Sequence, residues 1–221
     1  MKSAERKIQL AVDMLMVCIL LLQMSYSIAG ELIHEITGIA FFVLFIVHHI
    51  LSRKYTKALV KGKHNAEKII KLIVDIMLFI IIIAMMLSAM PISKHIFTFL
   101  GLSRYASAGR TVHLLGAYQG FALMSLHIGF HFNFILAKII KDKKKKIITY
   151  AVMAVLSAAG LYFFISEGIY KYMLLISRFV FFDTSGGLPL FITKYLLIMT
   201  MFASCGFTVM NLTKRKGRKN S

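Results

Sequence analysis

Six stretches of the chain are almost purely apolar, and each is long enough to cross a membrane as a helix. They cover residues 8–28, 32–51, 69–90, 112–140, 147–165 and 188–209. About 20 residues cross the hydrocarbon of a bilayer, where a helix is favoured because it satisfies its own backbone amides. The pattern therefore predicts an all-α integral membrane protein with six transmembrane helices. Asp13 and the absence of a small-residue cleavage site favour a retained first span over a signal peptide.

The polar residues that separate the spans are strongly basic. The chain is 58% hydrophobic, yet 27 Lys and Arg against 9 Asp and Glu give a formal charge of +18. Twenty-one of the 27 lie at the two ends of the chain, or in the gaps after the second and fourth spans and within three residues of them. Because such an excess marks the cytoplasmic side, both termini are predicted to be cytoplasmic. The basic runs favour contact with anionic lipid over binding of nucleic acid, because no soluble domain is expected in these residues to present them.

The first four spans contain a two-helix repeat. Val-Asp-Met-Leu around Asp13 opens the first span and Val-Asp-Ile-Met around Asp75 opens the third. The span that follows each begins with a histidine, His34 or His113, and soon has a glycine. The repeat predicts a four-helix bundle over 7–140, with a longer external loop in the second half.

Two additional transmembrane helices are predicted within 147–210. They are joined by an external segment, 167–187. Aromatic residues mixed with Lys171 and Arg178 over 171–182 predict a helix that lies in the outer interface. That segment has two interpretations, a membrane-embedded connector and a docking platform for an external partner.

Four histidines in the second and fourth spans share one spacing. His34 and His48, and likewise His113 and His127, are 14 residues apart. Fourteen residues make nearly four helical turns, so each pair projects from one face, about 21 Å apart along the axis. Both spans are predicted to run from outside to inside. His34 is then level with His113 (the outer pair) and His48 with His127 (the inner pair).

Two pairs of imidazoles facing each other inside a helical bundle suit the ligation of two haem b groups. Polar groups within a membrane usually have a function, and two neutral nitrogens can bind haem iron from opposite sides. An isolated histidine would instead fit an interhelical hydrogen bond. Gly38 and Gly116 lie close to the outer ligands and leave room for a flat macrocycle, although close helix contact is an equal explanation. His49 and His131 are competing inner ligands.

These residues resemble a known family. His-Glu-Ile-Thr-Gly from His34, Val-His-His-Ile-Leu-Ser-Arg from Val47, and His113 with the Leu-His-Ile-Gly-Phe-His run ending at His131 resemble the flavinylation-associated cytochromes b of bacterial membranes. The resemblance covers the four-helix core. It implies haem ligation by His34, His48, His113 and His127, in the bacterial cytoplasmic membrane, and an extracytoplasmic flavin-carrying partner. Ser185-Gly186-Gly187 departs from the motif for covalent flavin attachment, so no flavin is expected on this chain.

Other polar residues have several interpretations. Arg110 outside and Arg53 inside are candidates to hold haem propionates, or simple interfacial anchors. Asp13 and Asp75 have three roles open: orienting a ligand imidazole, pairing with Lys7 and Lys71, or relaying protons at an inner quinone site. The function expected is transmembrane electron transfer, between a quinol or cytoplasmic donor and an external flavoprotein. The alternatives are a transition-metal transporter using His127 and His131, and a structural subunit.

Overall fold

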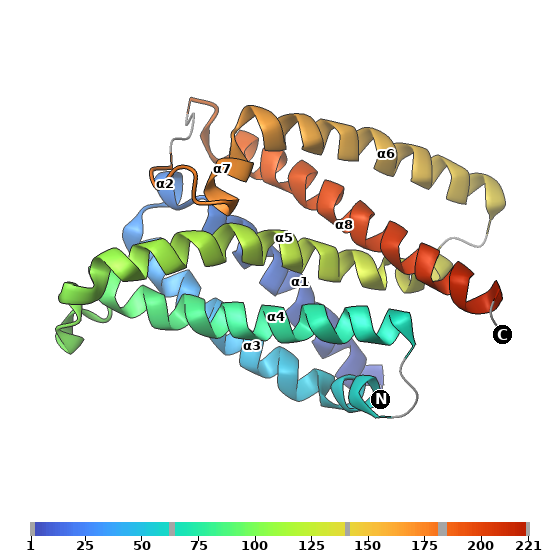
Figure 1. Cartoon of the computed structure of the whole chain (residues 1–221), viewed down its shortest axis with the longest axis horizontal. Coiled ribbons are helices and arrows are strands. Elements are labelled where there is room, and N and C mark those ends of the chain that lie inside the picture. The colour runs from blue at the N-terminus through green and yellow to red at the C-terminus, as the bar shows by residue number, and fades with distance from the viewer. Residues whose placement is uncertain (1–2, 62–64, 140–141, 181–184, 220–221) are drawn as a thin grey trace. The chain divides into compact units, whose positions relative to one another are not determined.

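The computed structural model describes residues 3–61, 65–139, 142–180 and 185–219, and within these residues the regular structure is all helix, without a strand (Figure 1). The α-helices are α1 (Ser3–Met24), α2 (Tyr26–Ala29), α3 (Glu31–Val60), α4 (Ala66–Ala89), α5 (Ala106–Ile139), α6 (Lys143–Ser166), α7 (Ile169–Met173) and α8 (Gly187–Lys219). Three 3-10 turns, at Met90–Ile92, Thr98–Leu100 and Ser103–Tyr105, form the loop between α4 and α5. The predicted all-α class is confirmed.

Five helices in the described residues are long and apolar enough to cross a membrane. They span Ala4–Met24, Glu31–Val60, Ala66–Ile92, Lys144–Ser166 and Gly187–Lys214. The remaining long helix, α5, is not among the five, and the side chains of its residues 133–139 lie outside the described part of the chain. The six-span count therefore remains a prediction.

The chain divides into two compact units, which are described separately. The first unit is Met1–Gly62, Ile81–Ala117 and Phe181–Ile192. The second unit is Lys63–Ile80, Tyr118–Val180 and Thr193–Ser221. Helices α4, α5 and α8 each contribute to both units. His34, His48 and His113 belong to the first unit, and His127 belongs to the second.

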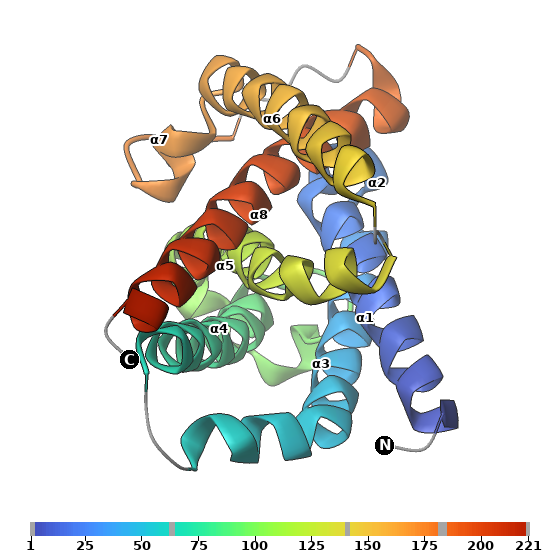
Figure 2. The same ribbon diagram turned by 90° about the vertical axis from the view of Figure 1, so that its right-hand side faces the viewer.

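In the first unit, α1 and α3 lie side by side as an antiparallel pair (Figures 1 and 2). The amide of Gln23 near the end of α1 donates to the carbonyl of His34 at 3.0 Å and to Thr37 Oγ1 at 2.7 Å. At the other end of the pair, Gln9 Nε2 donates to Ser52 Oγ at 3.0 Å. The polar contacts fix the register of α3, and therefore the height of its histidines.

The loop between α4 and α5 is fastened to α3 beside His34. The carboxylate of Glu35 accepts hydrogen bonds from Ser93 Oγ at 2.7 Å, Lys94 N at 2.7 Å and Ile96 N at 2.9 Å. The ammonium of Lys94 also donates to the Glu31 carboxylate, which raises the pKa of Lys94. The loop is thus ordered by carboxylates of α3.

The second unit has an apolar core between α4, α5 and α8. Val74, Leu78, Phe130 and Met210 are buried against one another. Helix α6 starts after Asp142, whose side chain caps it by accepting from Lys144 N at 2.9 Å, and Ser157 Oγ donates to Ser204 Oγ of α8 at 2.8 Å. The Ser157–Ser204 contact joins α6 to α8. Both helices lie outside the four-helix bundle that the sequence predicts.

The predicted interfacial helix over 171–182 is wrong. Helix α7 ends at Met173, and residues 181–184 lie outside the described part of the chain. The end has the hydrogen bonds of a Schellman motif: Leu175 N donates to Tyr172 O at 3.2 Å and Ile176 N to Lys171 O at 2.8 Å. Leu175 takes the left-handed position, with φ of 54°. This turn ends α7 after little more than one turn of helix.

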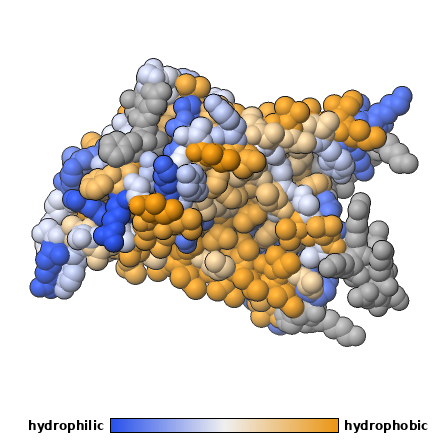
Figure 3. Space-filling view, turned by 45° about the horizontal axis from the view of Figure 1, so that its top comes forward, coloured by the Kyte–Doolittle hydropathy of each residue, from blue (hydrophilic) through white to orange (hydrophobic). Residues whose placement is uncertain are grey.

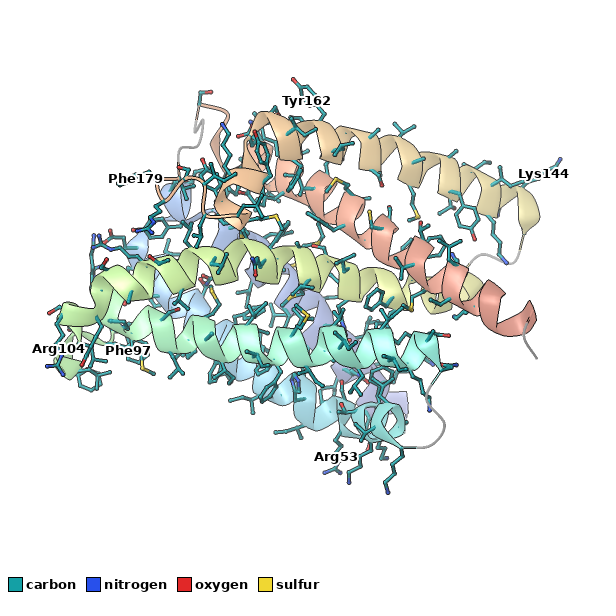
Figure 4. The ribbon with its side chains drawn as sticks, viewed as in Figure 1. Arg53, Phe97, Arg104, Lys144, Tyr162 and Phe179 are labelled. Carbon is teal, nitrogen blue, oxygen red and sulfur yellow. The ribbon has the colours of Figure 1, made fainter. Side chains whose placement is uncertain are left out.

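Large apolar side chains are exposed along the membrane-length helices. On α6, Val155 is 70% and Tyr162 is 66% exposed, and Figure 4 shows Lys144 and Tyr162 toward opposite ends of that helix. Apolar side chains also cover much of the face in Figure 3. Surface of this kind is unfavourable in water and stable in hydrocarbon, so it fits an integral membrane protein.

Candidate functional site

His34 and His113 lie face to edge in the first unit. Their ring centroids are 5.9 Å apart, and the ring planes meet at 67°. His34 is near the start of α3 and His113 is near the start of α5. The structure therefore brings together the two residues that the spacing of 14 assigned to the outer pair.

The Nδ1 atoms of the outer pair have different environments. Ser88 Oγ donates to Met85 O at 3.0 Å, so its lone pairs are left to accept from His113 Nδ1 at 3.3 Å. That tautomer leaves the Nε2 lone pair of His113 for a ligand. His34 Nδ1 is buried and finds no hydrogen-bond partner among the described residues, while Tyr26 packs edge-on at 5.2 Å between ring centroids.

His48 is oriented by a carboxylate from the neighbouring helix. Its Nδ1 lies 2.7 Å from Asp13 Oδ1 of α1, and both side chains are partly buried. A histidine that donates Nδ1–H to a carboxylate has its Nε2 lone pair available and its ring orientation fixed. The contact is therefore the arrangement expected behind a metal ligand.

The second unit contains the same pairing. His127 Nδ1 lies 2.8 Å from Asp75 Oδ1 of α4, although neither atom makes a hydrogen bond of good geometry with any described residue. The two atoms are therefore close, but the N–H of His127 is not aligned well enough for a hydrogen bond to Asp75. The His48–Asp13 contact, in contrast, has hydrogen-bond geometry.

The two aspartate–histidine contacts follow the repeat seen in the sequence. In each half, an aspartate of the leading helix reaches the second histidine of the following helix. Of the three roles open for Asp13 and Asp75, orientation of an imidazole matches these contacts. Lys71 instead pairs with Glu67, at 2.7 Å.

The two competing histidines are also placed. His49 Nδ1 donates to the carbonyl of Phe45 in its own helix at 2.9 Å, and the two rings are 4.2 Å apart. The ring of His131 lies 5.0 Å from that of His127. His49 thus packs against its own helix, whereas His131 remains a neighbour of His127.

The glycines beside the outer pair face other helices. A Cβ atom on Gly38 would meet only Gln23, at 3.6 Å, an ordinary contact. A Cβ atom on Gly116 would lie 2.6 Å from Met85 Sδ, so this glycine admits a flexible side chain of α4. The close-contact explanation fits Gly116, and Gly38 has room beside it.

The two candidate arginines are on the surface. Arg53 and Arg110 are both exposed. Figure 4 shows Arg53 and Arg104 toward opposite ends of the first unit. Their assignment to propionates, like that of the glycines to a macrocycle, remains a prediction.

Ser88, Tyr26 and Glu35 are site residues that sequence reasoning missed. Ser88 is in an apolar span, two residues before the loop that begins at Met90, with no motif around it. Glu35 directly follows His34. Its position next to a candidate ligand could have indicated that it lies beside the outer pair.

The distance within the outer pair fits two imidazoles on one metal ion. Nitrogens bound at about 2 Å on opposite sides of a metal place the two ring centres about 6 Å apart, against 5.9 Å in the structure. Within the described residues, no group of three or more His, Cys, Asp or Glu side chains could hold a metal ion by itself. The outer pair therefore offers two imidazole side chains to a metal ion, and the described residues add no third His, Cys, Asp or Glu ligand beside them.

No protein-family model, curated protein or solved structure matches this chain.

Proposed function

We propose that the protein is a membrane cytochrome b that transfers electrons across a bilayer through two bis-histidine haems. His34 and His113 would hold one haem, and His48 and His127 the other. The observation that carries the proposal is the outer pair at 5.9 Å, together with an aspartate behind each inner-pair histidine. The pairing of His48 with His127 itself rests on the sequence repeat.

The chain's own residues have three tasks in this proposal. Ser88 and the two aspartates hold the Nδ1 side of their histidines, so that Nε2 is the ligand atom. Glu35 and Gln23 fix the loop and the register of α3 around His34. The apolar helices keep bulk water away from the proposed haem sites. The haem supplies the one-electron chemistry when it is bound.

The resemblance to the flavinylation-associated cytochromes supports the proposed surroundings. It implies the bacterial cytoplasmic membrane, and the distribution of Lys and Arg supports both termini inside. Electrons would pass between a quinol or cytoplasmic-side donor and a flavin-carrying protein outside.

Electron transfer across a membrane is the first testable consequence. Purified protein in vesicles with trapped ferricyanide is expected to bleach the ferricyanide when a reduced quinol analogue is added outside. The rate should scale with the amount of protein. His34→Ala removes an outer-pair ligand and should bring the rate down to that of protein-free vesicles.

Two outcomes would count against the proposal. One is bleaching by the wild type no faster than in protein-free vesicles. The other is an undiminished rate in His34→Ala, which would mean that the outer pair is not on the electron path. His95→Ala is the matched control, because His95 is exposed in the loop and its backbone amide, which contacts Glu35, is unchanged.

A further inference from the structure

The last long helix crosses the helix of His127 at backbone contact. A Cβ atom on Gly129 of α5 would lie 2.0 Å from the carbonyl oxygen of Ala203 in α8. Reciprocally, a Cβ atom on Gly206 of α8 would lie 2.4 Å from the carbonyl oxygen of Leu126 in α5. Both contacts are with backbone, which cannot move aside as a side chain can. Each helix therefore requires a glycine at the point where the other crosses it.

Contacts above and below the crossing extend the α5–α8 interface. Phe121 packs on the buried Tyr195, with ring centroids 5.5 Å apart. Toward the other end, Phe132 packs on Phe207 at 5.7 Å, and the fully buried Met210 joins the core with Phe130. Helix α8 thus follows α5 from Phe121 to Phe132.

Helix α6 also packs on α8, again with a glycine against the backbone of the other helix. A Cβ atom on Gly160 would lie 2.1 Å from the carbonyl oxygen of Leu197, and Ser157 bonds Ser204. At the outer end, the Lys194 ammonium pairs with Glu167 at 2.6 Å. Helix α8 is therefore fixed by α6 at several heights.

This interface determines where α5 points its histidines. At about 100° per residue, His127 is rotated about 100° and His131 about 140° from Leu126, which contacts α8. Both rings therefore project away from α8, and Asp75 of α4 contacts His127 there. Rotating or sliding α5 would bring a residue with a Cβ atom to the place of Gly129, against the backbone of α8.

We propose that α6 and α8 form a positioning brace that sets the rotation and height of His127. Gly129 and Gly206 are its positioning residues, and neither touches the haem. The inference rests on the proposed haem ligation by His127, and it assigns a role to the two helices outside the four-helix core.

The test enlarges Gly206 in two steps and compares it with a neighbour. Gly206→Ala and Gly206→Leu are compared with Cys205→Leu, since Cys205 is exposed on the same helix. We expect Gly206→Ala to shift the midpoint potential and low-spin EPR signal of one haem, and Gly206→Leu to lower the haem content from two per chain toward one. The second haem, held by His34 and His113, should keep its signals, and Cys205→Leu should match the wild type.

The outcomes separate this inference from the proposed function. A wild type without haem would overturn the proposed function. With two haems in the wild type, unaltered signals in both Gly206 variants would overturn the brace. Equal disturbance of both haems in Gly206→Ala, in protein that elutes as the wild type does, would also overturn it, because the crossing would then support the whole fold rather than His127.

Discussion

Replacing His48 by alanine is expected to halve the haem content of the purified protein, from two per chain to one. His48 is oriented by Asp13 at 2.7 Å and shares a helix face with His34. His49→Ala is the matched control, because it removes an identical side chain at the next position. His49 bonds the carbonyl of Phe45 in its own helix, so its loss is expected to leave both haems bound. Haem-to-protein ratio, from extracted haem and amino-acid analysis, is the measurement.

The reverse result would show that His49, and not His48, is the inner ligand. If His49→Ala loses a haem and His48→Ala keeps both, the spacing of 14 does not select the inner ligand. His127→Ala and His131→Ala make the same comparison on α5, where the two rings are 5.0 Å apart. Loss of one haem is expected only with His127→Ala.

Replacing Asp13 or Asp75 by asparagine is expected to weaken the binding of one haem by about 10- to 100-fold, the usual cost of losing the group that orients a metal ligand. Asparagine keeps the size of the side chain and removes its charge. Since a nearby negative charge stabilises ferric over ferrous iron, the midpoint potential of that haem should also rise. Haem titration of the apoprotein and a redox titration give the two quantities.

Glu67→Gln controls for the loss of a carboxylate from α4. Glu67 pairs with Lys71 and Lys214, so its substitution should leave both haem potentials unchanged. Equal effects of Glu67→Gln and Asp75→Asn would show that charge alone matters. The Asp13→Asn effect is expected to be at least as large as that of Asp75→Asn, because its contact with histidine has hydrogen-bond geometry.

The helices were predictable from the apolar runs, but their ends were not. Hydropathy marks the part of a helix that fits hydrocarbon, whereas α3 continues to Val60 and α8 to Lys219, in sequence rich in Lys and Arg. Lysine and arginine are good helix formers, so a change in polarity is not a helix end. The short α7 ends at a leucine in a left-handed conformation, a position where a glycine would have been the signal.

The approach of His34 to His113 could be predicted, because histidines 14 residues apart on a helix lie on the same face of it. The partners of the histidines could not, since hydrogen bonds between helices depend on rotations that one sequence leaves open. Asp13 had a lysine six residues before it and a histidine 35 residues after it. Only three-dimensional structure distinguishes these partners.

The contact between α5 and α8 was likewise not predictable from the sequence. Small residues in a membrane helix indicate a close helix contact, and Ala203-Ser204-Cys205-Gly206 is such a run. The sequence does not say which helix it contacts, and the resemblance ended before α6. The reciprocal pair Gly129 and Gly206 becomes visible only when the helices are packed.

The most direct test of the haem proposal is the reduced-minus-oxidised absorption spectrum of protein purified from haem-replete cells. Two bis-histidine haems predict the sharp α band of low-spin b-type haem and two haems per chain. The His34→Ala and His48→Ala variants should each retain part of that band. A colourless preparation, or a band that survives unchanged when both histidines are replaced, would contradict the proposal.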